Sequence, residues 1–595
     1  MSETADKLAR LRAELKARGA TGFVVPRTDE HNSEYVPAYA ERLAWLTDFT
    51  GSAGTAVVLG DQAALFVDGR YVLQAAEQVD MDHITPVFIE EKKLAAWVKE
   101  AAQEGDVLGY DPKLHSIGWV KEVTEALAVK GAEAKPLSPN PIDAVWDDQP
   151  PLPTAAAVPH GAEFAGMAAA DKRAKIAETL ADKGADAAAI TMLDSVAWLL
   201  NIRGTDVVHT PVAQAYAIAH ADGAADLFID GAKVTDELRE HLGNQVRLRG
   251  YEEFDAALAD LGQAGKAVLA DPATASAAVF ATLEDAGAKL VKAADPCALP
   301  KAIKNEVEKE GTRRAHRRDG AALSEFLHWL AVEGPKGGLD EMDAADKLQA
   351  FRARRERFED LSFDTISGAG SNGAVIHYRV TEETNKPIEP DSVYLVDSGG
   401  QYLDGTTDVT RTVAIGEVGR EEKERFTLVL KGHIALATAR FPKGTGGGQL
   451  DTLARRPLWQ AGLDYDHGTG HGVGSYLAVH EGPQRIAKMN NGVGLEPGMI
   501  LSNEPGYYKP GAYGMRIENL VLVTEPEAVA GGERPMLGFE TLTLAPIDRN
   551  MILPELLTEA ERGWLNAYHA RVRTEITPHV DAETAAWLAE ATAEI

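Results

Sequence analysis

The chain is almost without cysteine, since Cys297 is the only one among its 595 residues. A single cysteine cannot form a disulfide within the chain, and it cannot supply the several thiolates of a zinc or iron–sulfur cluster. Any metal site in this protein must therefore be built mainly from oxygen and nitrogen ligands.

Long apolar runs and a basic surface are missing as well. No stretch approaches the roughly 18 uninterrupted apolar residues of a membrane-spanning helix, and the first ten residues lack the apolar core of a signal peptide. The chain has 91 acidic but only 60 basic residues, which gives a formal net charge of −31. Such a charge disfavours binding to nucleic acid or to anionic membranes. We therefore expect neither partner, and we expect a cytoplasmic protein.

The length indicates several domains, because domains average about 150 residues. A proline-rich segment at residues 138–153 is typical of a connector, and the composition changes to a charged helical pattern near residue 300. We predict an N-terminal domain at 1–153, a second at 154–300, a third at 301–550 and a helical C-terminal extension at 551–595.

The first two predicted domains carry a faint internal repeat. The string Leu65–Gly69 is echoed by Leu227–Gly231, and Ala44–Leu46 is echoed by Ala197–Leu199. The offsets of 162 and 153 residues are similar, which favours two related α/β domains in tandem. Chance matching of short apolar strings is the alternative.

The third predicted domain contains carboxylates and a histidine beside glycine, threonine or proline. Residues 392–396 and 409–415 are predicted to pair as strands, which would bring the aspartates that follow the first and precede the second close together. Taken singly, each of these residues could be a structural turn or loop residue. The candidate ligands are Asp397, Asp408, His471, Glu504 and Glu518.

Four carboxylates and one imidazole are too many ligands for one small cation. They suit two fairly hard divalent ions if some carboxylates bridge. Paired ions about 3.5–4 Å apart are a known device for hydrolysis, because they generate hydroxide at neutral pH and polarise the carbonyl that it attacks. The sequence therefore predicts a dinuclear metallohydrolase.

The motifs of this region resemble one family specifically. They are similar to those of the creatinase/methionine aminopeptidase ("pita-bread") metallopeptidases, and most of all to the long, three-domain form of the Xaa-Pro aminopeptidases, or aminopeptidases P. The resemblance implies an α/β (α+β) fold in which two tandem creatinase-like domains precede a pita-bread domain. The matching strings are Ile376–Tyr378, Val396–Thr412, His467–Gly474, Val479–Pro483, Asn503–Tyr508 and Arg516–Asn519.

The resemblance implies a role for each ligand. Asp408 and Glu518 would bridge the two ions, Asp397 would complete one ion's shell, and His471 and Glu504 would complete the other's. The family typically uses manganese, while zinc and cobalt stay open because affinity order alone does not select the ion used in cells. A hydroxide bridging the ions would attack the scissile carbonyl.

The resemblance also implies residues that act without binding metal. His377, His480 and Glu504 would be catalytic, the histidines by hydrogen bonding and Glu504 by handling the proton. For either histidine alone, ordinary packing is the simpler interpretation. Substrate contacts are predicted for His377, His467, His480, Arg516 and Tyr508.

The implied reaction is removal of the first residue from peptides with proline in second position, by an enzyme that forms a homodimer. A prolidase, which cleaves only Xaa-Pro dipeptides, would have the same ligands; the long N-terminal half favours the aminopeptidase. A non-catalytic scaffold of this fold is the alternative from another class, but such relatives lose the ligands. Creatinase works without metal, and a methionine aminopeptidase needs no such N-terminal half.

Overall fold

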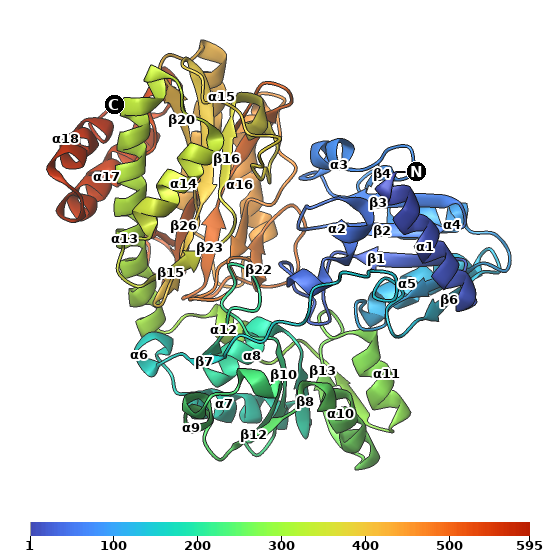
Figure 1. The fold of residues 1–595 in the computed structure, drawn as a ribbon. Coiled ribbons are helices and arrows are strands. Elements are labelled where there is room, and N and C mark those ends of the chain that lie inside the picture. The colour runs from blue at the N-terminus through green and yellow to red at the C-terminus, as the bar shows by residue number, and fades with distance from the viewer. Residues whose placement is uncertain (1) are drawn as a thin grey trace. The chain divides into compact units, whose positions relative to one another are not determined.

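The computed structural model describes residues 2–595, which divide into two compact units (Figure 1). The tandem unit comprises Met1–Ala162 and Met167–Ala298, and the C-terminal unit comprises Glu163–Gly166 and Leu299–Ile595. None of the helices in residues 2–595 combines the length and the hydropathy that a membrane-spanning segment requires.

The tandem unit contains two six-stranded sheets, each made from successive strands and helices. The first has the order β4-β3-β2-β1-β5-β6 and the second the order β12-β11-β10-β8-β13-β14. The strands of the first are β1 (Gly22–Pro26), β2 (Thr55–Leu59), β3 (Gln62–Val67), β4 (Thr85–Phe88), β5 (Val107–Tyr110) and β6 (Glu133–Pro136). Those of the second are β8 (Ala187–Ile190), β10 (Ala215–His220), β11 (Ala225–Ile229), β12 (Val246–Arg249), β13 (Ala267–Ala270) and β14 (Lys289–Lys292).

The two sheets share one pairing pattern, which confirms the predicted tandem α/β organisation. In each sheet the three strands at its centre pair antiparallel, and the outer strands on both sides pair parallel. The echoed strings occupy equivalent elements, because Leu65 lies in β3 and Leu227 in β11. The sheets' helices include α1 (Glu3–Ala17), α5 (Ile117–Ala128), α7 (Ala169–Asp182) and α11 (Ala277–Asp285).

Equivalent residues of the two halves also meet. Ser116 and Ser276 precede α5 and α11 at the same position, and their backbones form an antiparallel bridge. The amide of Ala277 donates to the carbonyl of His115 over 2.7 Å. The two domains of the tandem unit therefore contact each other through equivalent segments.

The C-terminal unit is built on two main sheets that touch through β20 and β26. The three-stranded sheet has the order β16-β17-β20, and the five-stranded sheet has the order β22-β21-β23-β26-β27. The first contains β16 (Ile366–Ala369), β17 (Ser392–Ser398) and β20 (Val409–Ile415). The second contains β21 (Gly470–Gly472), β22 (Glu481–Ile486), β23 (Ile500–Asn503), β26 (Asn519–Val523) and β27 (Phe539–Thr541).

Long helices flank these sheets (Figure 1). They are α13 (Glu306–Glu333), α14 (Glu341–Arg352), α15 (Arg420–Ala437) and α16 (Gly447–Gln460). Two short hairpin-like sheets complete the unit, one of β15 (Phe358–Leu361), β18 (Gly400–Tyr402) and β19 (Gly405–Thr406), the other of β24 (Gly506–Lys509) and β25 (Tyr513–Arg516). The apolar faces of α15 and α16 pack toward the sheets, as their buried residues show.

The helical C-terminal tail packs against the rest of the C-terminal unit. It forms α17 (Glu559–Ile576) and α18 (Ala582–Ala591), whose Leu565, Val572 and Leu588 belong to one buried cluster with residues of α15. Tyr568 donates its hydroxyl to the carbonyl of Ala545 over 2.8 Å. The tail is therefore part of the core of the C-terminal unit, because its apolar stripe fits the face that α15 leaves open.

Candidate metal centre

Two neighbouring strands carry the two candidate aspartates. Residues 392–398 form the buried strand β17, which pairs antiparallel with β20, and Asp397 lies opposite Thr410. Asp408 comes directly before β20, so both carboxylates lie at the same end of this hairpin. The predicted pairing of residues 392–396 with 409–415 is confirmed.

The second sheet supplies the other three candidates from adjacent strands. His471 is the middle residue of β21, and Glu504 directly follows β23. Glu518 directly precedes β26, in the two-residue link that joins β25 to β26. The amide of Glu518 donates to the carbonyl of Thr410 over 3.2 Å, which joins the two sheets at the site.

The side chains of all five candidates converge. Three overlapping groups have their ligand atoms within 4.8 Å of one another: Asp408 with His471 and His480, His471 with Glu504 and Glu518, and Asp397 with Asp408 and Glu518. Nε2 of His471 lies 3.4 Å from Asp408 Oδ2 and 3.6 Å from Glu504 Oε1. Asp408, Glu518 and His471 each belong to two groups, and of these three only Asp408 and Glu518 carry the two carboxylate oxygens that a ligand shared between two cations offers.

Two carboxylate oxygens of this cluster indicate that it binds a cation. Asp397 Oδ1 and Glu518 Oε1 are buried and have no hydrogen-bond partner in the part of the chain that the structure describes. The second oxygen of each is satisfied, by Arg516 Nη2 at 2.6 Å and by Thr410 Oγ1 at 2.7 Å. Because an unpaired buried carboxylate oxygen is costly, these two point to ligands other than protein. Four carboxylates beside one arginine fit two divalent cations in charge.

The pKa shifts of the clustered side chains also indicate a cation site. Burial raises the pKa of Asp397 to about 6, although Arg516 opposes the shift. Burial and the neighbouring Asp408 raise the pKa of Glu518 well above its usual range. Burial lowers the pKa of His471, but Asp408 and Glu504 outweigh it and raise the pKa to about 9. At neutral pH and without cations, Glu518 and His471 therefore hold protons that divalent ions would displace.

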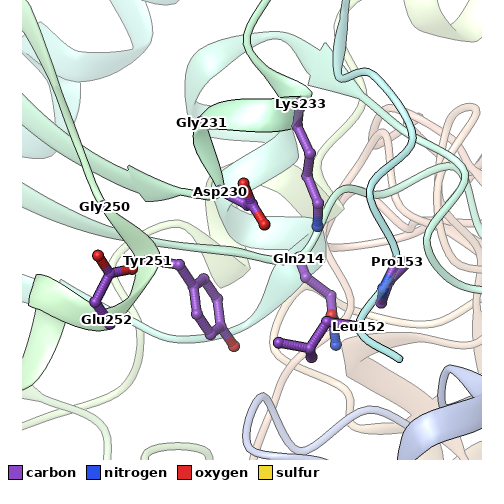
Figure 2. A pocket seen from close by; sticks show the side chains of 9 residues that line it. All are labelled: Leu152, Pro153, Gln214, Asp230, Gly231, Lys233, Gly250, Tyr251 and Glu252. Atoms are coloured by element: carbon purple, nitrogen blue, oxygen red, sulfur yellow. The ribbon is translucent and has the colours of Figure 1, made fainter. Parts of the chain in front are cut away.

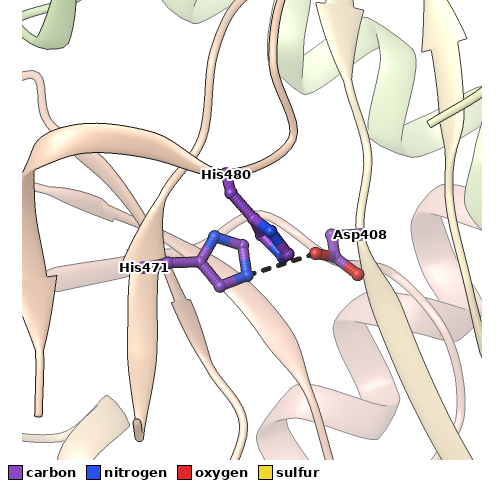
Figure 3. Close-up of side chains that lie close together, drawn as sticks. All are labelled: Asp408, His471 and His480. Carbon is purple, nitrogen blue, oxygen red and sulfur yellow. Dashed lines mark ion pairs between the residues drawn. The ribbon is translucent and has the colours of Figure 1, made fainter. Parts of the chain in front are cut away.

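His471 is oriented as a metal ligand. Its Nδ1 lies 3.0 Å from the carbonyl oxygen of Gly472 and donates to it, so Nε2, which faces the carboxylates, is the nitrogen that would bind a cation after losing its proton. The ring of His480 lies beside it, with centroids 4.3 Å apart and planes inclined by 74°. Figure 3 shows both rings directed toward Asp408. His480 is thus within reach of whatever the cluster binds.

Arg516 links the cluster to two further candidates. This buried guanidinium donates to Asp397 Oδ2, to Thr410 Oγ1 at 3.0 Å and to the Tyr508 hydroxyl at 2.6 Å. The Tyr508 hydroxyl lies 2.9 Å from Nε2 of His467, whose ring is partly exposed. Arg516 therefore contacts a candidate ligand directly, Tyr508 is connected to Asp397 through Arg516, and His467 is connected through Tyr508 and Arg516.

His377 is the candidate that the structure ties least to the cluster. It lies beyond β16 in the loop after Gly370–Ala374, is partly exposed, and belongs to none of the three groups of ligand atoms. Its predicted role stays a prediction.

Two hydroxyl residues at the cluster escaped the sequence analysis. Thr410 donates to Glu518, and Ser502 donates to Glu504 Oε1 at 3.1 Å while accepting the amide of His471 at 3.0 Å. Thr410 stands in a threonine-rich segment that contains Asp408, which was the available signal. Ser502 has no such signal, because a serine in an apolar strand is common.

A cavity of about 300 Å³ lies in the tandem unit, and Figure 2 shows the side chains around it. None of the predicted site residues lines it. Its lining residues are Leu152, Pro153, Gln214, Asp230, Gly231, Lys233, Gly250, Tyr251 and Glu252.

Comparison with family models accounts for nearly the whole chain. Residues 310–525 match metallopeptidase family M24, and residues 535–595 match the C-terminal region of that family. Residues 7–145 and 148–308 each match a creatinase/prolidase N-terminal domain.

Individual relatives extend the likeness over the full length. A probable Xaa-Pro aminopeptidase P of Neosartorya fischeri is 43% identical, with 100% of this chain and 93% of the relative covered. Aminopeptidase P2 of Arabidopsis thaliana is 42% identical over 95% of this chain and 84% of the relative.

A solved structure is similar throughout. The X-prolyl aminopeptidase of Caenorhabditis elegans, described as a cytosolic enzyme with a di-nuclear active site, superposes with a TM-score of 0.95 at 36% identity over 100% of both chains. The predicted fold class, two creatinase-like domains followed by a pita-bread domain, is thereby confirmed. The chain belongs to metallopeptidase family M24, among the Xaa-Pro aminopeptidases P.

Proposed function

We propose that this protein hydrolyses the first peptide bond of peptides whose second residue is proline, using two divalent cations. The observation that carries the proposal is the set of three overlapping ligand groups with two partnerless buried oxygens, in a chain similar over its full length to Xaa-Pro aminopeptidases. When bound, the cations would supply Lewis acidity that activates water and polarises the scissile carbonyl.

The ligands of the two ions are part of the proposal. Asp408 and Glu518 would be shared, Asp397 would serve one ion, and His471 with Glu504 the other, in keeping with the overlap of the three groups. Manganese is the proposed ion, since the ligands are chiefly carboxylate oxygens.

The side chains around the cations would handle protons and orient the peptide. Glu504, held through one oxygen by Ser502, would take a proton from the attacking water. The proline nitrogen carries no hydrogen in the substrate, so it must receive one when the C–N bond breaks, and Glu504 could return it. His480 would donate a hydrogen bond to the oxygen that gains charge, with His377 as a second donor. His467, Tyr508 and Arg516 would border the substrate.

Further features follow from the family rather than from the geometry. We propose a homodimer in the cytoplasm, the latter supported by the C. elegans enzyme being cytosolic. We also propose domain boundaries at 153/154, 300/301 and 550/551. The first two lie within about ten residues of the limits of the matched family models, whereas the third lies inside the C-terminal model, which begins at residue 535.

A panel of peptides tests the reaction. With manganese present, we expect Arg-Pro-Pro to lose one residue from its N-terminus, as detected by mass spectrometry, and Arg-Ala-Pro to be cleaved at least about 100-fold more slowly, because a slot shaped for the proline ring would lose about 3 kcal/mol with alanine. Hydrolysis confined to Xaa-Pro dipeptides would make the protein a prolidase. Failure to cleave any peptide would favour a scaffold.

A further inference from the structure

A buried ion cluster forms at the residue that follows His480 of the candidate metal centre. Glu481 follows His480 in the chain and is the first residue of β22. Its Oε1 accepts from Lys304 Nζ at 2.5 Å, and its Oε2 lies 3.1 Å from Lys301 Nζ. All three side chains are at most 3% exposed. Two ammonium groups and one carboxylate thus share a site closed to water.

The two lysines come from the very start of the C-terminal unit, before residue 310, where the match to family M24 begins. Their segment is fixed to the sheet by its backbone as well. The amide of Lys304 donates to the carbonyl of Gly498 over 3.0 Å, and Ile303 bridges Met499. Lys304 Nζ also donates to the carbonyl of Lys301 over 2.8 Å, which ties the two lysines together. We call residues 301–304 the clamp.

The clamp holds two strands that carry site residues. Gly498 and Met499 lead into β23, which Glu504 directly follows. Glu481 pairs through its backbone with Gly472, the residue after His471. The pairing is tight at this point, because a Cβ on Gly472 would lie 2.4 Å from the Glu481 carbonyl oxygen.

Chain adjacency connects the clamp to His480. His480 lies in the bend that leads into β22, one residue before Glu481, so the contacts that fix Glu481 also fix the backbone from which the His480 ring projects. That ring faces Asp408 and His471 (Figure 3). If Glu481 were released, the ring of His480 could turn away.

Stability alone does not explain the cluster. Burial of Lys301, Lys304 and Glu481 together removes three charged groups from water, which costs several kcal/mol per ion before compensation. Buried ion pairs are often no more stable than apolar side chains of the same size, so a geometric role fits better than a stabilising one.

We propose that Lys304 and Lys301 are positioning residues, which act through Glu481 to aim His480 at the substrate carbonyl. The inference rests on the role of His480 in the proposed function. Neither lysine touches a candidate ligand; they would act by holding the start of β22 in place.

The test replaces Lys304 by methionine in the full-length, manganese-loaded enzyme. We expect kcat for Arg-Pro-Pro to fall by about 10- to 100-fold, since a displacement of about 1 Å at a reacting group can cost 100-fold. KM and the content of two manganese ions per chain should change little. Lys304→Arg, which keeps the buried charge, should recover most of kcat.

A matched control separates positioning from folding. Lys233 is buried like Lys304 and bonds Asp206 at 2.5 Å, with side-chain exposures of 3% and 0%. Lys233→Met should lower the thermal midpoint as Lys304→Met does but leave kcat near the wild-type value. Equal losses of kcat in the two variants, or no loss in either, would overturn the proposal.

The crystal structure of manganese-loaded Lys304→Met gives a readout that does not depend on turnover. We expect the His480 ring to leave its position beside His471, whose centroid lies 4.3 Å away in the wild type. An unmoved ring refutes the inference. Wild-type protein that cleaves no peptide refutes the proposed function instead, while the position of the ring still decides the role of the lysines.

Discussion

Replacement of Asp408 by asparagine is expected to lower kcat/KM for Arg-Pro-Pro by at least about 1000-fold. Asp408 belongs to two of the three ligand groups, so its loss weakens the binding of both cations. Lewis-acid stabilisation of the transition state contributes several kcal/mol, and about 4 kcal/mol corresponds to about 1000-fold in rate. Steady-state kinetics with metal analysis of the same sample measures both effects.

Asp319→Asn is the control for this variant. Asp408 and Asp319 are each 3% exposed, but Asp319 pairs with Arg352 and lies outside the ligand groups. Asp319→Asn should lower the thermal midpoint and keep two ions and near-normal kcat/KM. If Asp408→Asn retained both ions and more than a tenth of wild-type activity, the assignment of Asp408 as a shared ligand would fail.

Replacement of Arg516 by methionine is expected to weaken manganese binding about 10- to 100-fold and to lower activity at limiting metal accordingly. Arg516 fixes the orientation of Asp397 through a 2.6 Å bond and that of Glu518 indirectly through Thr410. Loss of such a supporting contact typically costs 10- to 100-fold in metal affinity. The measurement is the manganese concentration that restores half of the activity after chelation.

Arg352→Met provides the matched comparison. Arg352 is also fully buried and pairs with one aspartate, Asp319, at 2.7 Å, so its removal leaves a buried carboxylate without a cation. Both arginine variants should lose about 3–5 kcal/mol of stability, which is typical when one partner of a buried ion pair is removed. Only Arg516→Met should shift the manganese requirement. An equal shift in both would make Arg516 a purely structural residue.

The sequence indicated the candidate metal ligands more clearly than the residues that orient them. Asp397, Asp408, His471, Glu504 and Glu518 stand in local motifs, because a ligand at the end of a strand needs a turn beside it. The tandem α/β sheets could also be predicted, since a repeat leaves the same apolar strings at similar offsets.

The supporting contacts left no such trace in the sequence. Lys304 and Glu481 are separated by 177 positions, and nothing near either residue indicates the other. The sequence likewise does not show what the C-terminal helices pack against, because an amphipathic pattern indicates that a face is buried but not which element covers it. Local motifs therefore indicate ligands, whereas the partners that orient them depend on tertiary structure.

The most direct test of a dinuclear peptidase is a titration of the chelated wild-type protein with manganese, in which cleavage of Arg-Pro-Pro and bound metal are measured together. Activity should rise with added metal and reach its plateau at two ions per chain. Full activity in metal-free protein, or no cleavage of the peptide with two ions bound, would contradict the proposed mechanism.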